Sequence, residues 1–410
     1  MMISDSTRAF VAAHRHDDVR DLALHARRDA DVDMPMALDQ IAGWRTASRK
    51  LPEWAACDDV LYPPHLSMEQ CSSQFTARYK EALARRIVAP EAGAEGPAGV
   101  LVDLTGGFGV DCSYMSRAFT RAVYVERQPH LCALARHNMA ALGLGHVDVV
   151  QADASDYVAS MDRADMVFID PARRDGHGGR TYAIADCTPD VLGMLDAILA
   201  VTPHLMVKLS PMLDWRKTVE DFRGHVEQVH LVSTGNECKE LLLVVGRGTC
   251  DDPLLVCVND DQRLECHASE TDGRSGPDAA TVTGDGDGVP ARTYLFEPNA
   301  SVMKAGCFSL LEERFDVHAV GRNSHLFLAG HDVAGFPGRR FVVERTSTMG
   351  RKELRAALSD LTHANIAVRN FPMSVEALRR RLKLKDGGDA YLFATTDHTG
   401  RHIVIRAVKA

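Results

Sequence analysis

The sequence lacks the features that would place this protein in a membrane or in an oxidising compartment. It has ten cysteines but no C-x-x-C pair and no regular cysteine spacing, which argues against a disulfide framework or a structural zinc site and favours reduced thiols. No apolar run reaches eighteen residues, and residues 1–18 hold no apolar core of signal-peptide length. We therefore expect a cytoplasmic protein that binds no metal and does not span a membrane.

The hydrophobic content of the chain is ordinary, but its charges are unevenly distributed along the sequence. The 410 residues are enough for two to four domains, and 45% hydrophobic content is typical of a globular chain. The net charge of −9 argues against a nucleic-acid partner for the chain as a whole. However, residues 336–410 carry fifteen Lys and Arg against seven Asp and Glu, a net +8, which leaves −17 for the rest. This distribution indicates that only the terminal segment would meet phosphates, although solubility alone could also produce it.

Residues 100–111, VLVDLTGGFGVD, combine a strand, a glycine turn and the start of a helix. The apolar run Val100–Val102 ends in a carboxylate, and an amphipathic helix begins near Asp111. Glycines allow positive φ and close approach of the backbone to a ligand, while the free N–H groups of the helix face the same spot. The stretch predicts a cofactor cradle at the carboxyl end of the first strand of an α/β sheet. The candidate ligand-binding residues here are Asp103, Thr105, Gly106, Gly107 and Gly109.

Acidic residues follow four successive apolar runs between residues 100 and 170. The spacing of the first two suits one βαβ unit whose second acidic residue binds a ribose. An aspartate in such a position often only caps the next helix, and about half of such residues in an arbitrary α/β protein would do no more. Four in order favour a ligand site over chance. They are Asp103, Glu126, Asp153 and Asp170.

A dinucleotide site is the competing interpretation of the glycine loop. Its motif, G-x-G-x-x-G, requires a third glycine where the helix packs on the strand. Here Val110, Asp111 and Cys112 follow Gly109 instead. The loop therefore favours a different cofactor.

With these motifs the chain resembles the class I S-adenosylmethionine-dependent methyltransferases. The resemblance implies an α/β fold with a Rossmann-like sheet, preceded by an N-terminal helical region and followed by small α+β domains. It implies S-adenosyl-L-methionine as cofactor, with the glycine loop holding the methionine part. It further implies that Glu126 binds the ribose, that Asp153 and Ala154 lie at the adenine, and that Asp170 lies next to both the cofactor and the methyl acceptor.

Further stretches extend the resemblance over nearly the whole chain. Five more stretches resemble bacterial class I methyltransferases that carry a ferredoxin-like module and a C-terminal THUMP-like domain. They are EQCSSQFTARYK at 69–80, DPARR at 170–174, EPNASVMKAG at 297–306, NSHLF at 323–327 and YLFATT at 391–396. The implied partner is structured RNA, tRNA or rRNA, which THUMP domains present to a methyltransferase. The expected domains are a helical region at 1–95, the methyltransferase domain at 96–250, an acidic flexible insertion at 251–292, the ferredoxin-like module at 293–335 and the THUMP-like domain at 336–410.

The expected acceptor site begins at Asp170. Asp170-Pro171-Ala172-Arg173 stands where methyltransferases acting on base amines have Asn/Asp-Pro-Pro-Tyr/Phe, so Asp170, Pro171 and Arg173 are the candidate catalytic residues. Asp170 could orient an amine by accepting its hydrogen bond. The alanine and arginine replace the second proline and the aromatic residue, which argues against an exocyclic amine as acceptor.

Each of four groups of candidate residues can be interpreted in two ways. Arg173 and Arg174 could stack on a base or clamp a phosphate, or could be a solvated pair. Lys208 could neutralise the acceptor or form a buried ion pair with Asp170, and the pair is favoured. Ser72 or Ser73 could cap a helix, or could close over the cofactor as the resemblance implies. The basic run that contains Arg380, Arg381 and Lys383 could bind RNA phosphates, or could simply suit a helix C-terminus.

Three functions fit these residues. The first is an RNA methyltransferase, the second a methyltransferase for a small molecule or protein, and the third a non-catalytic RNA-binding protein that retains the cofactor fold. A steep loss of RNA affinity with salt would separate the first and third from the second.

Overall fold

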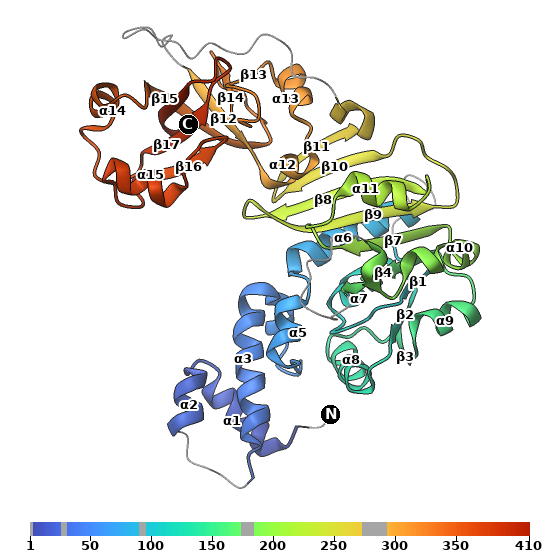
Figure 1. Ribbon diagram of the computed structural model, residues 1–410. Helices are drawn as coiled ribbons and strands as arrows, with labels where there is room; N and C mark the ends of the chain where they lie inside the picture. Colours follow the sequence, from blue (N-terminus) through green and yellow to red (C-terminus); the bar gives the residue numbers. More distant parts are fainter. Residues whose placement is uncertain (1–2, 26–30, 90–95, 174–183, 273–292) are drawn as a thin grey trace. The chain divides into compact units, whose positions relative to one another are not determined.

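The computed structural model describes residues 3–25, 31–89, 96–173, 184–272 and 293–410 (Figure 1). The chain divides into two compact units. The first comprises Met1–Val229 and Glu240–Asp251, and the second comprises His230–Lys239 and Asp252–Ala410.

Helices form the N-terminal part of the first unit. Side-chain caps fix where three of them begin: Ser4, Asp33 and Ser73 each accept a hydrogen bond from the backbone N–H three residues later. The helices are α1 (Asp5–His14), α2 (Val19–His25), α3 (Met34–Lys50), α4 (Pro52–Ala55), α5 (His65–Gln70) and α6 (Gln74–Val88).

A mostly parallel sheet follows. Its strands are β1 (Val100–Asp103), β2 (Arg121–Glu126), β3 (Val147–Gln151), β4 (Met166–Ile169), β7 (His204–Leu209), β8 (Val226–Thr234) and β9 (Glu237–Gly246). They follow the order β8-β9-β7-β4-β1-β2-β3, in which β1 to β4 and β7 are parallel and β9 is antiparallel to β7. The chain runs outward from β1 to β3 and returns to β4 on the other side of β1. The strand order thus reverses at β1 and β4, which is where α/β sheets bind ligands.

Short elements connect these strands. The helices are α7 (Val110–Met115), α8 (Pro129–Ala141), α9 (Ala154–Ser160), α10 (Val191–Val201) and α11 (Trp215–Asp221), with 3-10 turns η1 (Ser116–Ala118) and η2 (Ile184–Asp186). A two-stranded ribbon, β5 (Ala172–Arg173) with β6 (Cys187–Thr188), follows the end of β4. The architecture confirms the predicted α/β fold class with its N-terminal helices.

The second unit begins with a hairpin where the sequence predicted a flexible insertion. Strands β10 (Leu254–Asn259) and β11 (Gln262–His267) pair in antiparallel register and lead into η3 (Ala268–Asp272). In β11, the buried Leu264 and Cys266 alternate with the exposed Arg263, Glu265 and His267. This alternation is that of a half-buried strand, and the polar composition around it concealed the pattern. Residues 273–292 of the expected insertion lie outside the described residues.

One seven-stranded sheet contains both C-terminal segments. Its strands are β12 (Tyr294–Pro298), β13 (His318–Ala319), β14 (Phe327–Ala329), β15 (Gly338–Thr348), β16 (Asn365–Arg369), β17 (Tyr391–Thr396) and β18 (His402–Lys409), in the order β13-β14-β12-β15-β18-β17-β16. β12 pairs along its full length with β15, from Tyr294–Val342 to Pro298–Gly338. The expected boundary at residues 335 and 336 therefore separates two sequence segments but not two sheets.

Four helices accompany this sheet: α12 (Ala300–Ala305), α13 (Phe308–Phe315), α14 (Arg351–Leu358) and α15 (Val375–Leu382). Helices α14 and α15 share one hydrophobic core, in which Leu354 and Leu378 pack with Leu392 and Val404 of the sheet. The alternate strand residues, such as Phe393 and Ile405, belong to a different core. Because side chains alternate across a strand, α14 and α15 cover the same face of the sheet.

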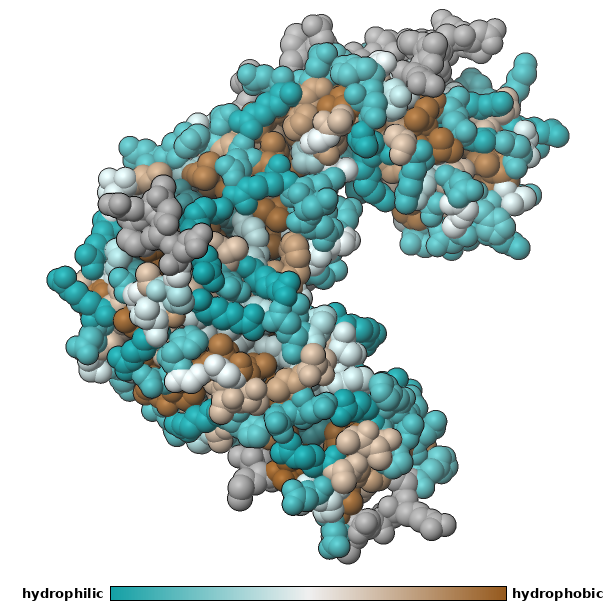
Figure 2. All heavy atoms as spheres, turned by 180° about the vertical axis from the view of Figure 1, so that it is seen from behind, coloured by the Kyte–Doolittle hydropathy of each residue, from teal (hydrophilic) through white to brown (hydrophobic). Residues whose placement is uncertain are grey.

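The described helices include none that is both long and apolar enough to cross a membrane. On the face drawn in Figure 2, most of the surface is hydrophilic, and hydrophobic residues occur in small separate areas.

Candidate cofactor and acceptor site

The glycine loop between β1 and α7 depends on two of its glycines for its shape. A Cβ at Gly106 would lie 2.2 Å from the ring of Tyr124, so no larger residue fits there. Gly109 has a φ of 91°, a left-handed conformation that suits glycine, and α7 begins immediately after it. Tyr124 also donates a hydrogen bond from its hydroxyl to the carbonyl of Gly107. The loop is thus held against β2, with its backbone close to the ends of the strands.

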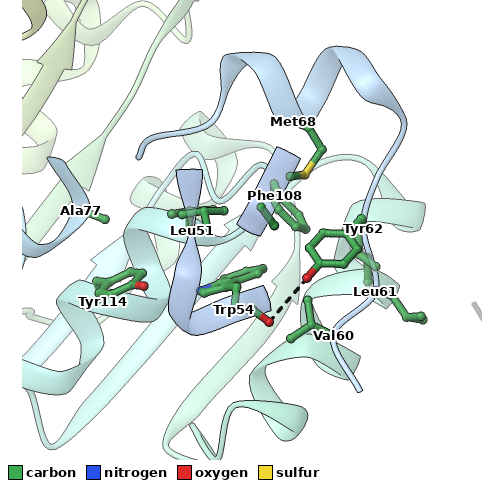
Figure 3. Packing of buried hydrophobic residues seen from close by; sticks show 12 residues of the cluster. Leu51, Trp54, Val60, Leu61, Tyr62, Met68, Ala77, Phe108 and Tyr114 are labelled. Carbon is green, nitrogen blue, oxygen red and sulfur yellow. Dashed lines mark hydrogen bonds between the residues drawn. The ribbon is translucent and has the colours of Figure 1, made fainter. Parts of the chain in front are cut away.

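Phe108 anchors the glycine loop to the core that contains the N-terminal helices. Its side chain is buried in the core formed by the N-terminal helices, where its ring centroid lies 4.8 Å from that of Trp54. Figure 3 shows Phe108 among Met68, Tyr62 and Trp54. The single aromatic residue among the glycines therefore joins the N-terminal helical region to the cofactor loop.

The acidic residues at the first two strand ends bind this loop through its backbone. Asp103 is buried, and its Oδ1 accepts from the N–H of Thr105 at 3.0 Å. Glu126 is also buried. Its Oε2 accepts from the N–H of Gly107 at 3.1 Å, and its Oε1 accepts from the N–H of Gln128 at 2.8 Å. Both carboxylates thus help to fix the conformation of the loop that they border.

The other two acidic residues, Asp153 and Asp170, follow β3 and β4 at the same edge of the sheet. Asp153 caps α9 and accepts from the N–H of Ser155 at 2.9 Å, next to the buried Ala154. Its capping role is the plain alternative considered from the sequence. Asp170 donates its backbone N–H to Oγ1 of Thr105 at 2.7 Å, which ties the end of β4 to the glycine loop.

Lys208 at the end of β7 holds the side chain of Asp170. Its Nζ lies 2.5 Å from Oδ2 of Asp170 and 3.3 Å from Oδ2 of Asp111. Burial by itself lowers the pKa of Lys208, but Asp170, Asp111 and Glu240 outweigh it and raise this pKa well above its ordinary value. Lys208 is therefore a permanent cation. It forms the ion pair with Asp170 that the sequence favoured, although only the lysine of this pair is nearly buried.

A second lysine extends this pair into a network that the sequence reasoning missed. Lys80 of α6 is fully buried, and its Nζ lies 3.1 Å from Oδ1 of Asp111, 2.5 Å from Oε2 of Glu240 and 3.3 Å from Oγ of Ser72. The Ser72 hydroxyl lies 2.8 Å from Oδ2 of Asp111 and 3.1 Å from Oε1 of Glu240. The helix cap is Ser73, so Ser72 is free for this role.

The sequence did contain a signal for Lys80. The buried face of α6 consists of Thr76, Ala77, Lys80, Leu83 and Ala84, which follow helical spacing. A lysine in the middle of an apolar helix stripe requires buried acidic partners. Its partners could not be identified from the sequence, because Asp111 and Glu240 are distant along the chain.

The surroundings of the two buried aspartates of the site, Asp103 and Asp111, shift their pKa values in opposite directions. Burial raises the pKa of Asp103 to about 8, and the nearby charges of Asp111 and Asp170 add to this effect, while the hydrogen bond from Thr105 opposes it. Burial also raises the pKa of Asp111, but Lys80 and Lys208 outweigh it and bring this pKa to about 2. At neutral pH the structure therefore favours a protonated Asp103 beside an ionised Asp111.

The remaining candidate residues divide between the two units. Pro171 is buried after β4, and the backbone of Arg173 pairs with Cys187 in the β5–β6 ribbon. The side chain of Arg173 and all of Arg174 lie outside the described residues. The described residues contain no group of three or more His, Cys, Asp or Glu that could hold a metal ion. The last three candidates, Arg380, Arg381 and Lys383, belong to the second unit and are exposed.

Comparison with known proteins adds two families and several relatives. Residues 294–337 match a ferredoxin-like domain family, and residues 338–409 match a THUMP domain-like family. An uncharacterized S-adenosylmethionine-dependent methyltransferase, found in two strains of Mycobacterium tuberculosis, is 29% identical over 306 residues, covering 70% of this chain and 74% of the relative. A crystal structure from Porphyromonas gingivalis W83, described as that of a candidate methyltransferase, matches over 100% of both chains with 27% identity and a TM-score of 0.84.

The fold, the glycine loop and these relatives define the chain as an S-adenosylmethionine-dependent methyltransferase. More particularly, it is one whose C-terminal part consists of a ferredoxin-like and a THUMP-like segment. The residues of the site also fit the cofactor. S-adenosylmethionine carries a sulfonium and an ammonium group against one carboxylate. Apart from the protonated Asp103, the site contains three carboxylates, Asp111, Asp170 and Glu240, against the two ammonium groups of Lys80 and Lys208. A cationic ligand thus meets a surplus of negative charge.

Proposed function

We propose that this protein methylates structured RNA in the cytoplasm, with the transfer in the first unit and phosphate binding in the C-terminal part of the second. The match of residues 338–409 to the THUMP domain-like family supports an RNA substrate. None of the ten cysteines, all of which lie within the described residues, forms a disulfide, which suits a reducing compartment.

The exposed cations of α14 and α15 are the observation that carries the RNA proposal. Arg339, Arg369 and Arg406 of this unit are each paired with a carboxylate. By contrast, a set of exposed cations on or just after α14 and α15 has no ion pair within the described part of the chain. This set is Arg351, Lys352, Arg355, Arg380, Arg381, Lys383 and Lys385.

The position of these cations suits the phosphate backbone. Helices α14 and α15 cover the same face of the sheet and share a core, so both sets of cations belong to one side of the unit. Phosphates attract unpaired cations without sequence readout, whereas cations that are already paired add little. We therefore assign RNA binding to both helices, whereas the sequence indicated only the run after residue 378.

In the first unit, Asp170 is the candidate for orienting the acceptor. One of its carboxylate oxygens is held by Lys208, and its side chain is 37% exposed, whereas that of Lys208 is only 12% exposed. The second oxygen can accept a hydrogen bond from the N–H or O–H group to be methylated. The cofactor supplies an electrophilic methyl group. Asp170 aims the acceptor lone pair at it, and Pro171 and the β5–β6 ribbon fix the backbone that carries this carboxylate.

The test compares modified nucleosides in RNA from cells with and without the gene. Mass spectrometry should find one methylated species missing, and the purified protein with S-adenosylmethionine should restore it in RNA from the deficient cells. Identical nucleoside profiles together with no methyl transfer to this RNA would overturn the RNA proposal and would favour a small-molecule or protein acceptor.

A further inference from the structure

The side chains of the ion-pair network in the first unit become more exposed from one end of the network to the other. Side-chain exposure rises along its members from 0% at Lys80 to 10% at Asp111, 12% at Lys208 and 37% at Asp170. Each member is paired with the next. The chain of charges therefore starts at a fully buried lysine of α6 and ends at Asp170, the most exposed member of the network.

Five elements contribute to this network. Lys80 comes from α6, Asp111 from the first turn of α7, Lys208 from β7 and Glu240 from β9, and Asp170 directly follows β4. Desolvating two ammonium groups and their carboxylates is costly, and apolar side chains of similar volume often stabilise a core equally well or better. Stability alone is therefore a poor explanation for a fully buried lysine at this place.

Lys80 has three partners. It donates hydrogen bonds to Glu240 and Ser72, and its Nζ forms an ion pair with Oδ1 of Asp111. Asp111 in turn lies between two ammonium groups, Lys80 on one side and Lys208 on the other. Lys208, which lies between Asp111 and Asp170, is 3.3 Å from Asp111 but only 2.5 Å from Asp170.

We propose that Lys80 is a positioning residue of the methyl-acceptor site, which acts through Asp111 and Lys208 to fix the carboxylate of Asp170. Without Lys80, Asp111 keeps a single cation. Attraction is stronger where water is excluded, so Lys208 moves towards the buried Asp111 and away from the half-exposed Asp170. The segment at residues 72–80 is in this view part of the active site, although it precedes the glycine loop.

The most direct test is a charge-balanced variant. Replacing Lys80→Met alone leaves Asp111 and Glu240 without their cation and endangers folding. The double variant Lys80→Met with Glu240→Gln removes one positive and one negative charge together and preserves the balance of the core. The matched control is Lys50→Met. Lys50 tethers the same segment through the carbonyls of Met68 and Glu69, and no carboxylate partner of Lys50 occurs within the described residues.

The first readout is the crystal structure of the double variant. We expect Nζ of Lys208 to lie more than 4 Å from Oδ2 of Asp170, while the control keeps the wild-type pair. Calorimetry with S-adenosylhomocysteine should give unchanged affinity in both. An intact Lys208–Asp170 pair in the double variant would overturn the proposal, whether or not RNA proves to be the substrate.

The second readout rests on the proposed function and uses RNA from cells that lack the gene. The double variant should lose kcat by roughly 10- to 100-fold with little change in KM, since displacement of an orienting group affects the chemical step. The variant Lys80→Arg keeps the cation and should recover most of this loss. Wild-type kcat in the double variant would contradict the proposal, whereas absence of transfer in the wild type would refute the proposed substrate and leave the crystallographic test decisive.

Discussion

Lys80 and Lys208 in the first unit are buried between carboxylates, whereas the exposed cations on or just after α14 and α15 in the second unit have no ion pair within the described residues. Burial with several partners fixes the position of a charge, which suits the orientation of a reacting group. Exposure without partners leaves a charge free to act on a phosphate chain, and salt screens that action. In this account, the buried cations of the first unit position the reacting group, and the exposed cations of the second unit attract RNA phosphates.

The largest expected effect is on stability and concerns the first unit alone. Phe108→Ala removes a buried ring that packs on Trp54, so it should lower the free energy of unfolding by about 3–5 kcal/mol. Arg380→Ala on the exposed face of α15 should change it by less than about 0.5 kcal/mol. Urea denaturation measures both. Equal effects of the two substitutions would remove the contrast between the regions.

Asp170→Ala should reduce methyl transfer by about 100-fold, because the acceptor loses its orienting carboxylate. RNA affinity should stay as in the wild type, since Asp170 lies in the first unit. Single-turnover transfer of labelled methyl and filter binding give the two quantities. Undiminished methylation by this variant would exclude Asp170 as the acceptor residue.

The raised pKa of Asp103 predicts an unusual pH dependence of stability. Its pKa is about 8 in the folded protein against an ordinary 3.8, so between these values the folded state keeps a proton that the unfolded state has released. Stability from this group therefore falls as pH rises from about 4 to 8, by up to about 1.4 kcal/mol per pH unit. Asp103→Asn should flatten this slope in urea titrations at pH 5 to 8. An equally steep slope in the variant would show that other groups cause it.

The smallest effect concerns the exposed cations of the second unit. The triple variant Arg380→Ala, Arg381→Ala and Lys383→Ala should weaken RNA binding and lower the salt dependence of log K by about three, since each phosphate contact contributes about one. Catalysis at saturating RNA should not change. The matched control removes three exposed arginines of the first unit, Arg20, Arg49 and Arg127, and should leave the salt slope unaltered. A control that behaves like the triple variant would indicate a response to net charge only.

Much of the first unit could be predicted because its signals are local. The apolar runs, their acidic ends and the glycines at 106, 107 and 109 lie within short windows, and strand periodicity together with glycine conformation is enough to order them. The Lys208–Asp170 pair was also foreseeable, because Lys208 lies near the carboxyl end of β7 and Asp170 directly follows β4, and these two strands are parallel neighbours. Lys80 and Glu240 were not, because their contact joins residues 160 positions apart in the sequence.

The second unit was harder to predict for a different reason. Strand β11 is short, and its alternation is surrounded by charged residues, so the segment resembled a linker. The pairing of β12 with β15 crosses the segment boundary expected at residue 335, and strand partners across such a distance leave no local trace. The basic run after α15 was visible as composition, but the companion cations of α14 gained meaning only when both helices were found on one face of the sheet.

The most direct test of the division of labour is a steady-state comparison of Asp170→Ala with the triple variant of α15, with RNA from gene-deficient cells as substrate. The account predicts that Asp170→Ala lowers kcat and leaves RNA affinity intact, while the triple variant raises KM for RNA and leaves kcat intact. If both variants lower kcat and affinity together, positioning and attraction are not separated between the two units, and the account is contradicted.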